Sequence, residues 1–556
     1  MGSGCETCTH LTGADGRNPP AVPPAYRSKE IAVFKSPYPD EQIPNVSVFD
    51  FLFSELSEAD AARTAIVDGT TGAETTFGTL KQHIELIAGA LAGGGLGLGD
   101  VVALHCPNVP AFASVFHGIL RSGATATTIN ALYTAEEIET QLRDSGAKLL
   151  FTVSPLLQQA RAGAIAAGLE QDAIIVLDGA EGYHDLRELL AAGLPAPEVS
   201  FDPATHVAVL PYSSGTTGKP KGVMLSHTNL VANVVQTYPV LDVEDDDVVL
   251  ALLPFFHIYG MTVLLDIAIK KRARLVTMPK FELGEFLRII ETHRCTYLFI
   301  APPIAVALAK HPLIDTFDLS SVRSVFSGAA PIDVALMKAV ADRIGTRTRQ
   351  GYGMSEASPV THVLPPTETG MSLGSVGVPI ANTEVKLVSV DTGKEIDAVE
   401  DGQSEPGEIW VRGPQIMLGY LGRDDATHEA VDSDGFLHTG DIATVGPLGE
   451  FTIVDRLKEL IKYKGYQVAP AELEALLLTH PDITDSAVVG ALDADGQEIP
   501  KAFVVRREGS PLDEAGVEAF VAGHVAPHKK VRAVAFIDVI PKSASGKILR
   551  KDLRAR

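Results

Sequence analysis

Short runs of uninterrupted apolar residues constrain the fold of this chain more than any other feature. They alternate with helical patterns through the first two thirds of the sequence, at residues 101–105, 149–153, 173–177, 248–253 and 297–300. A strand that is apolar at every position must be covered on both faces, whereas a strand with one solvated face alternates apolar and polar residues. The runs therefore predict strands packed between helices, in an α/β architecture of stacked layers.

The last third of the chain has a different texture. Residues 407–413 alternate apolar and polar side chains, so we expect a β-rich subdomain at about 374–440. A charged segment at 455–459 precedes a predicted helix at 470–479, which has Pro470 at its first position. Because 556 residues exceed the size at which one core keeps growing, we expect separate domains. The expected divisions are a leader at 1–30, a large N-terminal domain at 31–455 and a small C-terminal domain at 456–556.

Charge and composition exclude several classes of partner. The net charge of −24 argues against nucleic acid or an anionic membrane surface, because both would be repelled. No uncharged apolar run reaches the ~18–20 residues needed to span a bilayer, and the N-terminus lacks the basic and apolar regions of a signal peptide. The cysteines are too sparse for a disulfide framework, so a reducing cytoplasm fits best.

Residues 212–222, Tyr-Ser-Ser-Gly-Thr-Thr-Gly-Lys-Pro-Lys-Gly, carry the strongest chemical signal. Their glycines allow successive backbone N–H groups to turn toward one anion, and their hydroxyls and lysines add donors and positive charge. The segment is not a Walker A loop, because Pro220 follows Lys219 where that pattern needs Ser or Thr. A flexible linker is the alternative, but apolar runs flank the segment on both sides. We therefore predict a loop that binds a polyphosphate.

Further motifs follow this loop in a fixed order. They are the segments 350–356 (Gln-Gly-Tyr-Gly-Met-Ser-Glu), 439–441 (Thr-Gly-Asp), 461–467 (Ile-Lys-Tyr-Lys-Gly-Tyr-Gln) and 541–550 (Pro-Lys-Ser-Ala-Ser-Gly-Lys-Ile-Leu-Arg). The ordered set resembles the motifs of the adenylate-forming superfamily, which includes acyl-CoA synthetases, 4-coumarate–CoA ligases, luciferases and peptide-synthetase adenylation domains. The resemblance runs from residue 37 to the C-terminus. Ser355 stands where the family usually has Thr, which retains the hydroxyl.

The resemblance implies an ATP-dependent carboxylic acid–CoA ligase that works in two steps. The acid first displaces pyrophosphate from ATP to form an acyl-adenylate, and the thiol of CoA then displaces AMP. ATP, Mg²⁺ and CoA are thus the implied cofactors and co-substrates, and a small-molecule carboxylic acid is the implied partner. The protein is expected to be a monomer or homodimer, with a small, mobile α+β C-terminal domain that turns on a hinge at Lys458.

The same resemblance implies which residues form the site. ATP and AMP are assigned to Ser213, Ser214, Gly215, Thr216, Thr217, Lys221, Gln350, Gly351, Tyr352, Ser355, Asp441, Arg456, Lys458, Lys462, Gln467 and Lys547. The acyl group is assigned to His257, Tyr259, Val263, Ala301, Pro302, Gly328, Ala329, Gly351 and Val363. CoA is assigned to Lys280, Lys464 and Gly465.

Among these residues, Lys547, His257 and Glu356 are the expected catalytic residues. The resemblance places Lys547 between the substrate carboxylate and the α-phosphate, and makes Glu356 the protein ligand of Mg²⁺. It assigns Tyr352 to adenine stacking and Asp441 to the ribose hydroxyls, whose protons a carboxylate accepts well. His257 is expected to gate or orient the acyl group rather than to act as a general base.

The sequence looks closest to 4-coumarate–CoA ligases, so cinnamate-type acids are the expected substrates. Small residues at 328, 329 and 351 predict a flat slot for an aromatic ring, in which Tyr259 meets a ring hydroxyl. Medium-chain fatty acids are the alternative, because apolar slots discriminate weakly. An amino-acid-activating domain would need a carboxylate near His257, and the residues just before it, Phe255 and Phe256, provide none. A luciferase differs from this sequence around the histidine. A non-catalytic nucleotide-binding protein would be expected to lose Lys547 or Glu356, and both are present.

Overall fold

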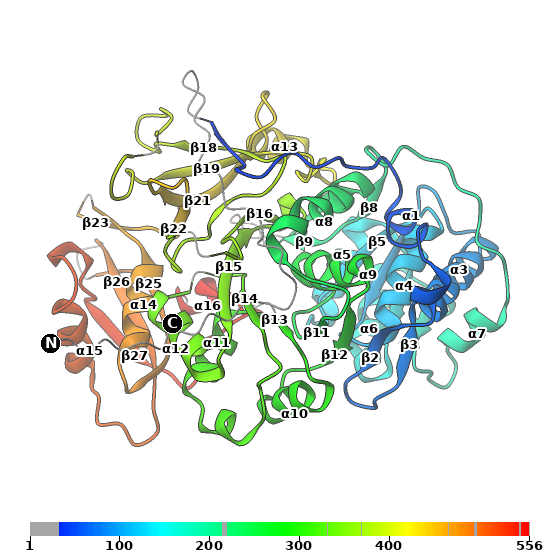
Figure 1. The fold of residues 1–556 in the computed structure, drawn as a ribbon, viewed down its shortest axis with the longest axis horizontal. Coiled ribbons are helices and arrows are strands. Elements are labelled where there is room, and N and C mark those ends of the chain that lie inside the picture. The colour runs from blue at the N-terminus through cyan, green and yellow to red at the C-terminus, as the bar shows by residue number, and fades with distance from the viewer. Residues whose placement is uncertain are drawn as a thin grey trace, which may run out of the picture.

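The computed structural model describes residues 33–213, 220–330, 332–367, 370–397, 399–464, 466–493, 497–543 and 546–554, with residues 466 and 467 described in their backbone alone. The leader predicted at 1–30 lies outside these residues, as do the predicted site residues Ser214, Gly215, Thr216, Thr217 and Gly465. The described chain confirms the predicted α/β class, with a large N-terminal domain and a small C-terminal domain (Figure 1).

The first sheet of the large domain is formed mainly by residues before 226. Its strands in spatial order are β20 (Gly419–Tyr420), β10 (Lys221–Ser226), β8 (Val207–Val209), β5 (Thr125–Ile129), β4 (Val101–His105), β6 (Ala147–Thr152) and β7 (Ile174–Val176), with β9 (Tyr212–Ser213) paired to β10. Its main helices are α3 (Phe77–Gly93), α4 (Pro110–Arg121), α5 (Ala135–Ser145) and α6 (Leu157–Ala167).

Helices cover both faces of this sheet, as the uninterrupted apolar runs predict. Val102 and Leu104 of β4 pack with α3 and α4, whereas Ala103 packs with α5 and α6. The parallel pairing of β4 with both β5 and β6 places this strand in the middle of the sheet. The predicted strands at 149–153 and 173–177 are present with ends shifted by one or two residues.

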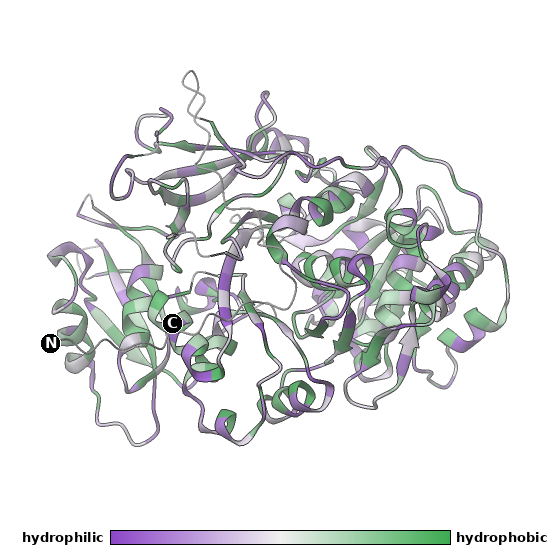
Figure 2. Cartoon of the chain, viewed as in Figure 1, coloured by the Kyte–Doolittle hydropathy of each residue, from purple (hydrophilic) through white to green (hydrophobic). Residues whose placement is uncertain are grey.

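Most of the residues predicted to bind the acyl group lie on strands of the second sheet or directly after them. Its strands in spatial order are β17 (Val378–Pro379), β16 (Val360–Val363), β15 (Arg347–Gly353), β14 (Ser324–Ser327), β13 (Tyr297–Ile300), β11 (Val248–Ala251), β12 (Arg274–Thr277), β2 (Thr64–Asp68) and β3 (Glu74–Thr76). One face packs on α10 (Leu283–His293), α11 (Pro302–Lys310) and α12 (Val334–Ile344), and the other face lies in the main core. Figure 2 shows the central strands as mainly hydrophobic, with β15 as a hydrophilic exception.

Strand direction in this sheet brings distant segments to one edge. β13, β14 and β15 are parallel, so the residues that follow them lie side by side at their carboxyl ends. Ligands of open α/β sheets bind at such edges, because the connecting loops gather there. The predicted acyl segments at 301–302 and 328–329 both lie at this edge.

Helix α8 (His227–Leu241) follows the predicted phosphate loop, directly after strand β10. Ser226 is its N-cap, and Asn229 completes a capping box with it. The apolar side chains of Leu230, Val231, Val234 and Val235 on this helix are buried.

A third, antiparallel sheet corresponds to the predicted β-rich subdomain. Its strands in order are β1 (Phe34–Lys35), β18 (Glu384–Val388), β19 (Gly407–Arg412), β21 (Leu437–Val445) and β22 (Phe451–Arg456). Burial alternates along β19, in agreement with the sequence pattern. The sheet reaches Arg456, where it places Asp441 of β21 directly opposite Arg456 of β22.

The small domain lies at the left of Figure 1 and has its own hydrophobic core, which includes Ile461, Leu473, Leu477 and Val488. Its elements are β23 (Ile461–Tyr463), β24 (Tyr466–Val468), α14 (Pro470–Thr479), β25 (Ile483–Leu492), β26 (Glu498–Arg506), α15 (Glu514–Ala522), β27 (Ala533–Phe536) and α16 (Arg550–Arg554). Helix α14 has the predicted bounds. The predicted boundary between residues 455 and 456 stays a prediction.

One polar contact between the domains joins two helix ends. The ammonium of Lys310, at the end of α11, donates to the carbonyl of Leu478 in α14 at 2.9 Å. This contact places a positive charge at the negative end of the α14 dipole.

The remaining segments are short or connect the sheets. They are α1 (Val48–Phe53), α2 (Glu58–Ala61), η1 (Ser154–Leu156), η2 (Gln171–Ala173), α7 (Leu186–Ala191), α9 (Ile267–Lys271), η4 (Pro312–Thr316), η5 (Ser355–Ala357), α13 (Asp424–Ala430) and η6 (Pro527–Lys529). No helix in the described residues has the length and apolar character that a bilayer crossing requires.

Candidate active site

The glycines predicted to line the acyl slot have different surroundings. A Cβ on Gly328 would lie 2.7 Å from Cε1 and 2.8 Å from the hydroxyl oxygen of Tyr259, so this glycine makes room for the tyrosine ring. A Cβ on Gly351 would instead lie 2.7 Å from the Phe326 ring and 2.9 Å from a backbone oxygen of β16. Gly351 therefore serves the packing of the sheet, whereas Gly328 borders the tyrosine that the sequence assigns to the acyl slot.

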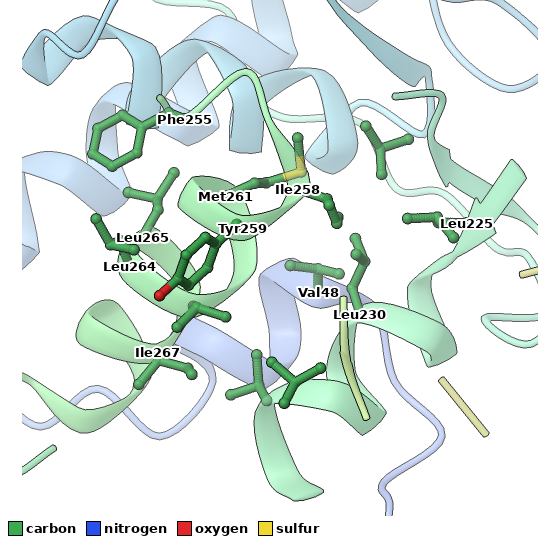
Figure 3. Packing of buried hydrophobic residues seen from close by; sticks show 14 of the residues in the cluster. Val48, Leu225, Leu230, Phe255, Ile258, Tyr259, Met261, Leu264, Leu265 and Ile267 are labelled. Atoms are coloured by element: carbon green, nitrogen blue, oxygen red, sulfur yellow. The ribbon is translucent and has the colours of Figure 1, made fainter. Parts of the chain in front are cut away.

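Tyr259 is buried at the start of a π-helix, η3 (Tyr259–Asp266). Figure 3 shows its ring among apolar side chains that include Leu264 and Leu265 of the same segment. The ring packs edge to face on Phe299, with centroids 6.4 Å apart. Its hydroxyl has no hydrogen-bond partner among the described residues. Burial raises the pKa of Tyr259 well above its usual value, so the group remains a neutral phenol that lacks an acceptor.

His257 lies immediately before this π-helix. A loop separates it from the nearest preceding strand, β11, which ends at Ala251. The backbone N–H of Tyr259 donates to Nδ1 of His257 at 3.2 Å, so the proton of the neutral ring is assigned to Nε2. Burial, with the Lys547 ammonium as a second cause, lowers the pKa of His257 to about 4. His257 is thus a neutral donor at neutral pH.

Asn108 fixes the loop between β11 and His257. Its side-chain amide donates to the carbonyls of Ala251 and Leu253, both at 2.8 Å, and its carbonyl accepts from the N–H of Phe255 at 2.8 Å. The side chain is only 3% exposed, so each bond is made in a site that water does not reach. Asn108 therefore sets the path of the chain into His257.

Lys547 is carried by a tight turn of the small domain. The N–H of Ser543 donates to the carbonyl of Lys547 at 2.8 Å, and the N–H of Lys547 donates to Oγ of Ser543 at 3.1 Å. Gly546 has φ of 83°, a conformation that favours glycine. A Cβ on Gly546 would lie 3.1 Å from Cβ of Ala301 and 3.6 Å from Cδ of Pro303. The lysine turn therefore rests on the segment predicted to bind the acyl group.

The ammonium of Lys547 lies among charged groups of both signs. Burial is the main cause that lowers the pKa of Lys547, to about 8, and the positive charge of Arg456 acts in the same direction. The carboxylates of Asp441 and Glu459 oppose this shift. Lys547 is consequently mostly protonated at pH 7, although it loses its proton more readily than an exposed lysine.

Asp441 joins the predicted adenine and ribose residues. One oxygen, Oδ2, accepts from the hydroxyl of Tyr352 at 2.6 Å, and the other, Oδ1, lies 3.2 Å from Nε of Arg456. Its own N–H donates to Oγ1 of Thr439 at 3.1 Å. A carboxylate has about four acceptor sites, so these bonds leave capacity for ribose hydroxyls.

Glu356 lies in a second polar group, at the base of the predicted phosphate loop. Its Oε1 accepts from Oγ of Ser213 at 3.0 Å and from the hydroxyl of Tyr420 at 2.9 Å. The ammonium of Lys221 lies 4.7 Å from the centroid of the Tyr420 ring. Glu356 is 6% exposed, so its charge is held by these hydroxyl donors rather than by bulk water.

The other predicted residues are more dispersed. Gln350 donates to the carbonyl of Leu373 at 2.6 Å, Val363 lies opposite Gly351 in β16, and Val263 is buried in η3. Ser355 opens η5, and Pro302 begins α11. The following predicted residues are exposed: Ala329, Lys280, Lys458, Lys462 and Lys464. The side chain of Gln467 lies outside the described part of the chain.

Comparisons with known proteins agree with this geometry. A model of the family described as AMP-binding enzyme matches residues 53–421, and a model of the AMP-binding enzyme C-terminal domain matches residues 472–547. The chain belongs to the AMP-binding enzyme family. The match to the large domain contains Ser213, His257 and Glu356, and the match to the small domain ends at Lys547.

Individual relatives of this AMP-binding enzyme cover nearly its whole length. It is 42% identical over 542 residues to 4-coumarate–CoA ligase 3 of Oryza sativa subsp. japonica, an alignment of 95% of this chain and 96% of the relative. The solved structure of ATP-bound MatB from Rhodopseudomonas palustris superposes with a TM-score of 0.82 at 27% identity, covering 92% of this chain and 99% of that one. The structure of the anthranilate CoA ligase AuaEII in complex with anthranoyl-AMP also gives a TM-score of 0.82, at 28% identity, and covers 92% and 97% of the two chains.

Within this AMP-binding enzyme the structure brings two sets of predicted residues together. Lys547, Arg456 and Asp441 meet near His257, and Ser213, Glu356 and Lys221 meet at the loop. Sequence reasoning missed Asn108 and Tyr420. Neither residue stands in a motif that a single sequence reveals, because each contacts a segment more than 60 residues away.

Proposed function

We propose that this enzyme is an ATP-dependent carboxylic acid–CoA ligase that acts on 4-coumarate- and cinnamate-type acids. The observation that carries the proposal is the 42% identity to a 4-coumarate–CoA ligase over 95% of the chain. The docking of Lys547 beside Arg456, Asp441 and His257 supports it, because these groups suit the joining of two anions.

In the first step, a carboxylate oxygen of the acid attacks the α-phosphorus of ATP. The bond from that phosphorus to the bridging oxygen breaks, and pyrophosphate leaves with the bonding electrons. Lys547 stabilises the charge that develops on the α-phosphate and the carboxylate, and Arg456 adds a second positive charge at the same place. His257, neutral with its proton on Nε2, orients the carboxylate as a hydrogen-bond donor and takes no proton.

In the second step, the sulfur of CoA attacks the acyl carbon of the adenylate. The bond from that carbon to the AMP oxygen breaks, AMP leaves, and the thiol proton passes to solvent. The Lys547 turn rests on Ala301 and Pro303 in this structure, which suits the first step. We propose that the small domain then turns about Lys458, so that Lys547 withdraws and Lys464 approaches the CoA.

The residues around Glu356 fit Mg²⁺. The donor set is a buried carboxylate beside the hydroxyls of Ser213 and Tyr420, which are the hard oxygen groups that this ion prefers. Among the described residues, no group of three or more His, Cys, Asp or Glu could hold a metal ion. Glu356 would therefore hold Mg²⁺ together with phosphate oxygens and water, and the bound ion would offset the charge of the phosphates.

The wall of the acyl slot supports an aromatic acid over a long alkyl chain. The Tyr259 ring lies against Gly328 and packs edge to face on Phe299, so these two rings would form an aromatic end wall of the proposed slot. The unpartnered Tyr259 hydroxyl offers a donor to a ring hydroxyl, whereas an alkyl chain would leave it unsatisfied.

A panel of acids tests the proposal. Cinnamates, benzoates and C6–C12 fatty acids are supplied with ATP, Mg²⁺ and CoA, and both pyrophosphate release and thioester formation are measured. We expect 4-coumarate to give the highest kcat/KM, and the Lys547→Ala variant to lose at least about 10²–10³-fold in adenylation while it still converts preformed acyl-adenylate to thioester. If no acid in the panel supports pyrophosphate release, the proposal is wrong.

A further inference from the structure

Tyr420 is held firmly beside the phosphate loop although no motif contains it. It ends β20, whose residues pair with β10, the strand that leads out of the loop. The N–H of Leu421 donates to the carbonyl of Gly222 at 2.9 Å, and the N–H of Tyr420 donates to Oγ1 of Thr427 at 2.9 Å. The side chain is 9% exposed. These two backbone N–H groups, of Tyr420 and of the next residue, thus fix the position of the ring.

The ring lies between two groups of opposite charge. The hydroxyl donates to Oε1 of Glu356 at 2.9 Å, and the ammonium of Lys221 lies 4.7 Å from the ring centroid. Both charged residues are in the described part of the chain, and within it they form no ion pair with each other. Lys221 is half-buried and Glu356 is buried, so without the ring between them the two charges would attract each other more strongly than in water.

Such a pair would harm the nucleotide site. Lys221 is needed for phosphate and Glu356 for a cation, and each would be neutralised by the other. A phenol avoids this outcome because its hydroxyl satisfies the carboxylate without adding charge, while its ring face attracts the ammonium.

We propose that Tyr420 is a positioning residue that keeps Lys221 and Glu356 apart, so that one stays available to the ATP phosphates and the other to Mg²⁺. The proposal rests on the proposed function for the roles of these two residues. Tyr420 itself touches neither the acid nor the CoA in this account.

Equilibrium binding of ATP, with Mg²⁺ and with a chelator instead, tests the proposal by calorimetry. Tyr420→Phe keeps the ring and loses the hydroxyl, so ATP affinity without Mg²⁺ should be unchanged, whereas the strengthening by Mg²⁺ should fall about tenfold. Tyr420→Leu removes the ring as well, so Lys221 and Glu356 should pair and ATP affinity without Mg²⁺ should also fall about tenfold.

A second substitution identifies the cause. In the Tyr420→Leu background, Glu356→Gln removes the charge that captures Lys221, so ATP affinity without Mg²⁺ should return to within about twofold of wild type. A purely structural role for Tyr420 would not allow this recovery. If Tyr420→Leu fails to fold, as judged by circular dichroism, the Tyr420→Phe measurement alone decides through its Mg²⁺ dependence.

Tyr238 supplies the matched control. It is a half-buried tyrosine with the ammonium of Lys271 5.3 Å from its ring centroid, and it lies outside the candidate site. Tyr238→Phe and Tyr238→Leu should leave ATP binding unchanged with and without Mg²⁺. Wild-type ATP binding by both Tyr420 variants, or a loss that Glu356→Gln does not reverse, would overturn the proposal.

These measurements need neither acid nor CoA, so their failure is separable from that of the proposed function. A protein that binds ATP as described but forms no thioester from any acid would refute the ligase activity and leave the role of Tyr420 standing.

Discussion

The lowered pKa of Lys547 makes a quantitative prediction about the pH dependence of adenylation. The proposed mechanism needs the ammonium in the first step, and burial together with Arg456 lowers the pKa of Lys547 to about 8. At pH 9 only about a tenth of the enzyme would carry the proton, whereas a lysine with the ordinary pKa would remain almost fully charged. Adenylation kcat/KM, which reports the free enzyme, should therefore fall about 25-fold between pH 7.5 and 9.5.

The assay is pyrophosphate release at subsaturating ATP, with thioester formation from preformed acyl-adenylate measured in parallel. Only the first half-reaction should lose rate with the Lys547 titration. Lys547→Arg keeps its charge throughout, so any residual adenylation activity of that variant should be flat over the same range.

Glu459 offers a control outside the predicted site. Its carboxylate, which is paired with Arg554, raises the pKa of Lys547. In Glu459→Gln, adenylation kcat/KM should therefore begin to fall at a lower pH than in the wild type. The reasoning would be refuted if adenylation kcat/KM of the wild type stayed constant up to pH 10, or if the pH profile of Glu459→Gln were not shifted. Either result would show that the surroundings of Lys547 do not set its charge.

Three further predictions concern packing and domain contact. Gly328→Leu should lower kcat/KM for 4-coumarate by at least about tenfold, because its side chain would overlap the Tyr259 ring; an unchanged value would mean that the slot lies elsewhere. Lys310→Met removes the donor to the Leu478 carbonyl, so this arrangement of the domains should lose about 1 kcal/mol of stabilisation. Adenylation should then slow up to about fivefold, whereas thioester formation should be unchanged. Parallel changes in both steps would contradict this. Asn108→Ala should lower the free energy of unfolding of the large domain by about 2–4 kcal/mol in denaturant melts, because three buried loop groups lose their partner; an unchanged melt would show that the loop is held by other contacts.

The layered fold could be predicted from the sequence because its signals are local. Uninterrupted apolar runs mark strands covered on both faces, and the bounds of β4, β13 and α14 agree with the runs that predict them. The cap of α8 is an equally local feature, since Ser226 stands next to the helix that it caps.

The site was predictable in its motifs but not in its supports. The π-helix at Tyr259–Asp266 has no local signature, because its hydrogen-bond pattern depends on packing around it. The partners of Asn108 lie 143–147 residues away, and Tyr420 meets Glu356 across 64 residues. Such contacts arise only after the chain has folded, and a single sequence contains no pattern that reports them.

The place where Gly546 meets Ala301 and Pro303 makes one surface serve two purposes. Under the proposed function, this segment borders the acid, and the same atoms contact the lysine turn. An acid that displaces Ala301 or Pro303 would keep the small domain from docking on the large domain. A poor substrate would then be rejected through a slow first step even when it binds well. Redesign of the slot at these positions should thus change turnover more than affinity, which favours selecting variants by rate rather than by occupancy.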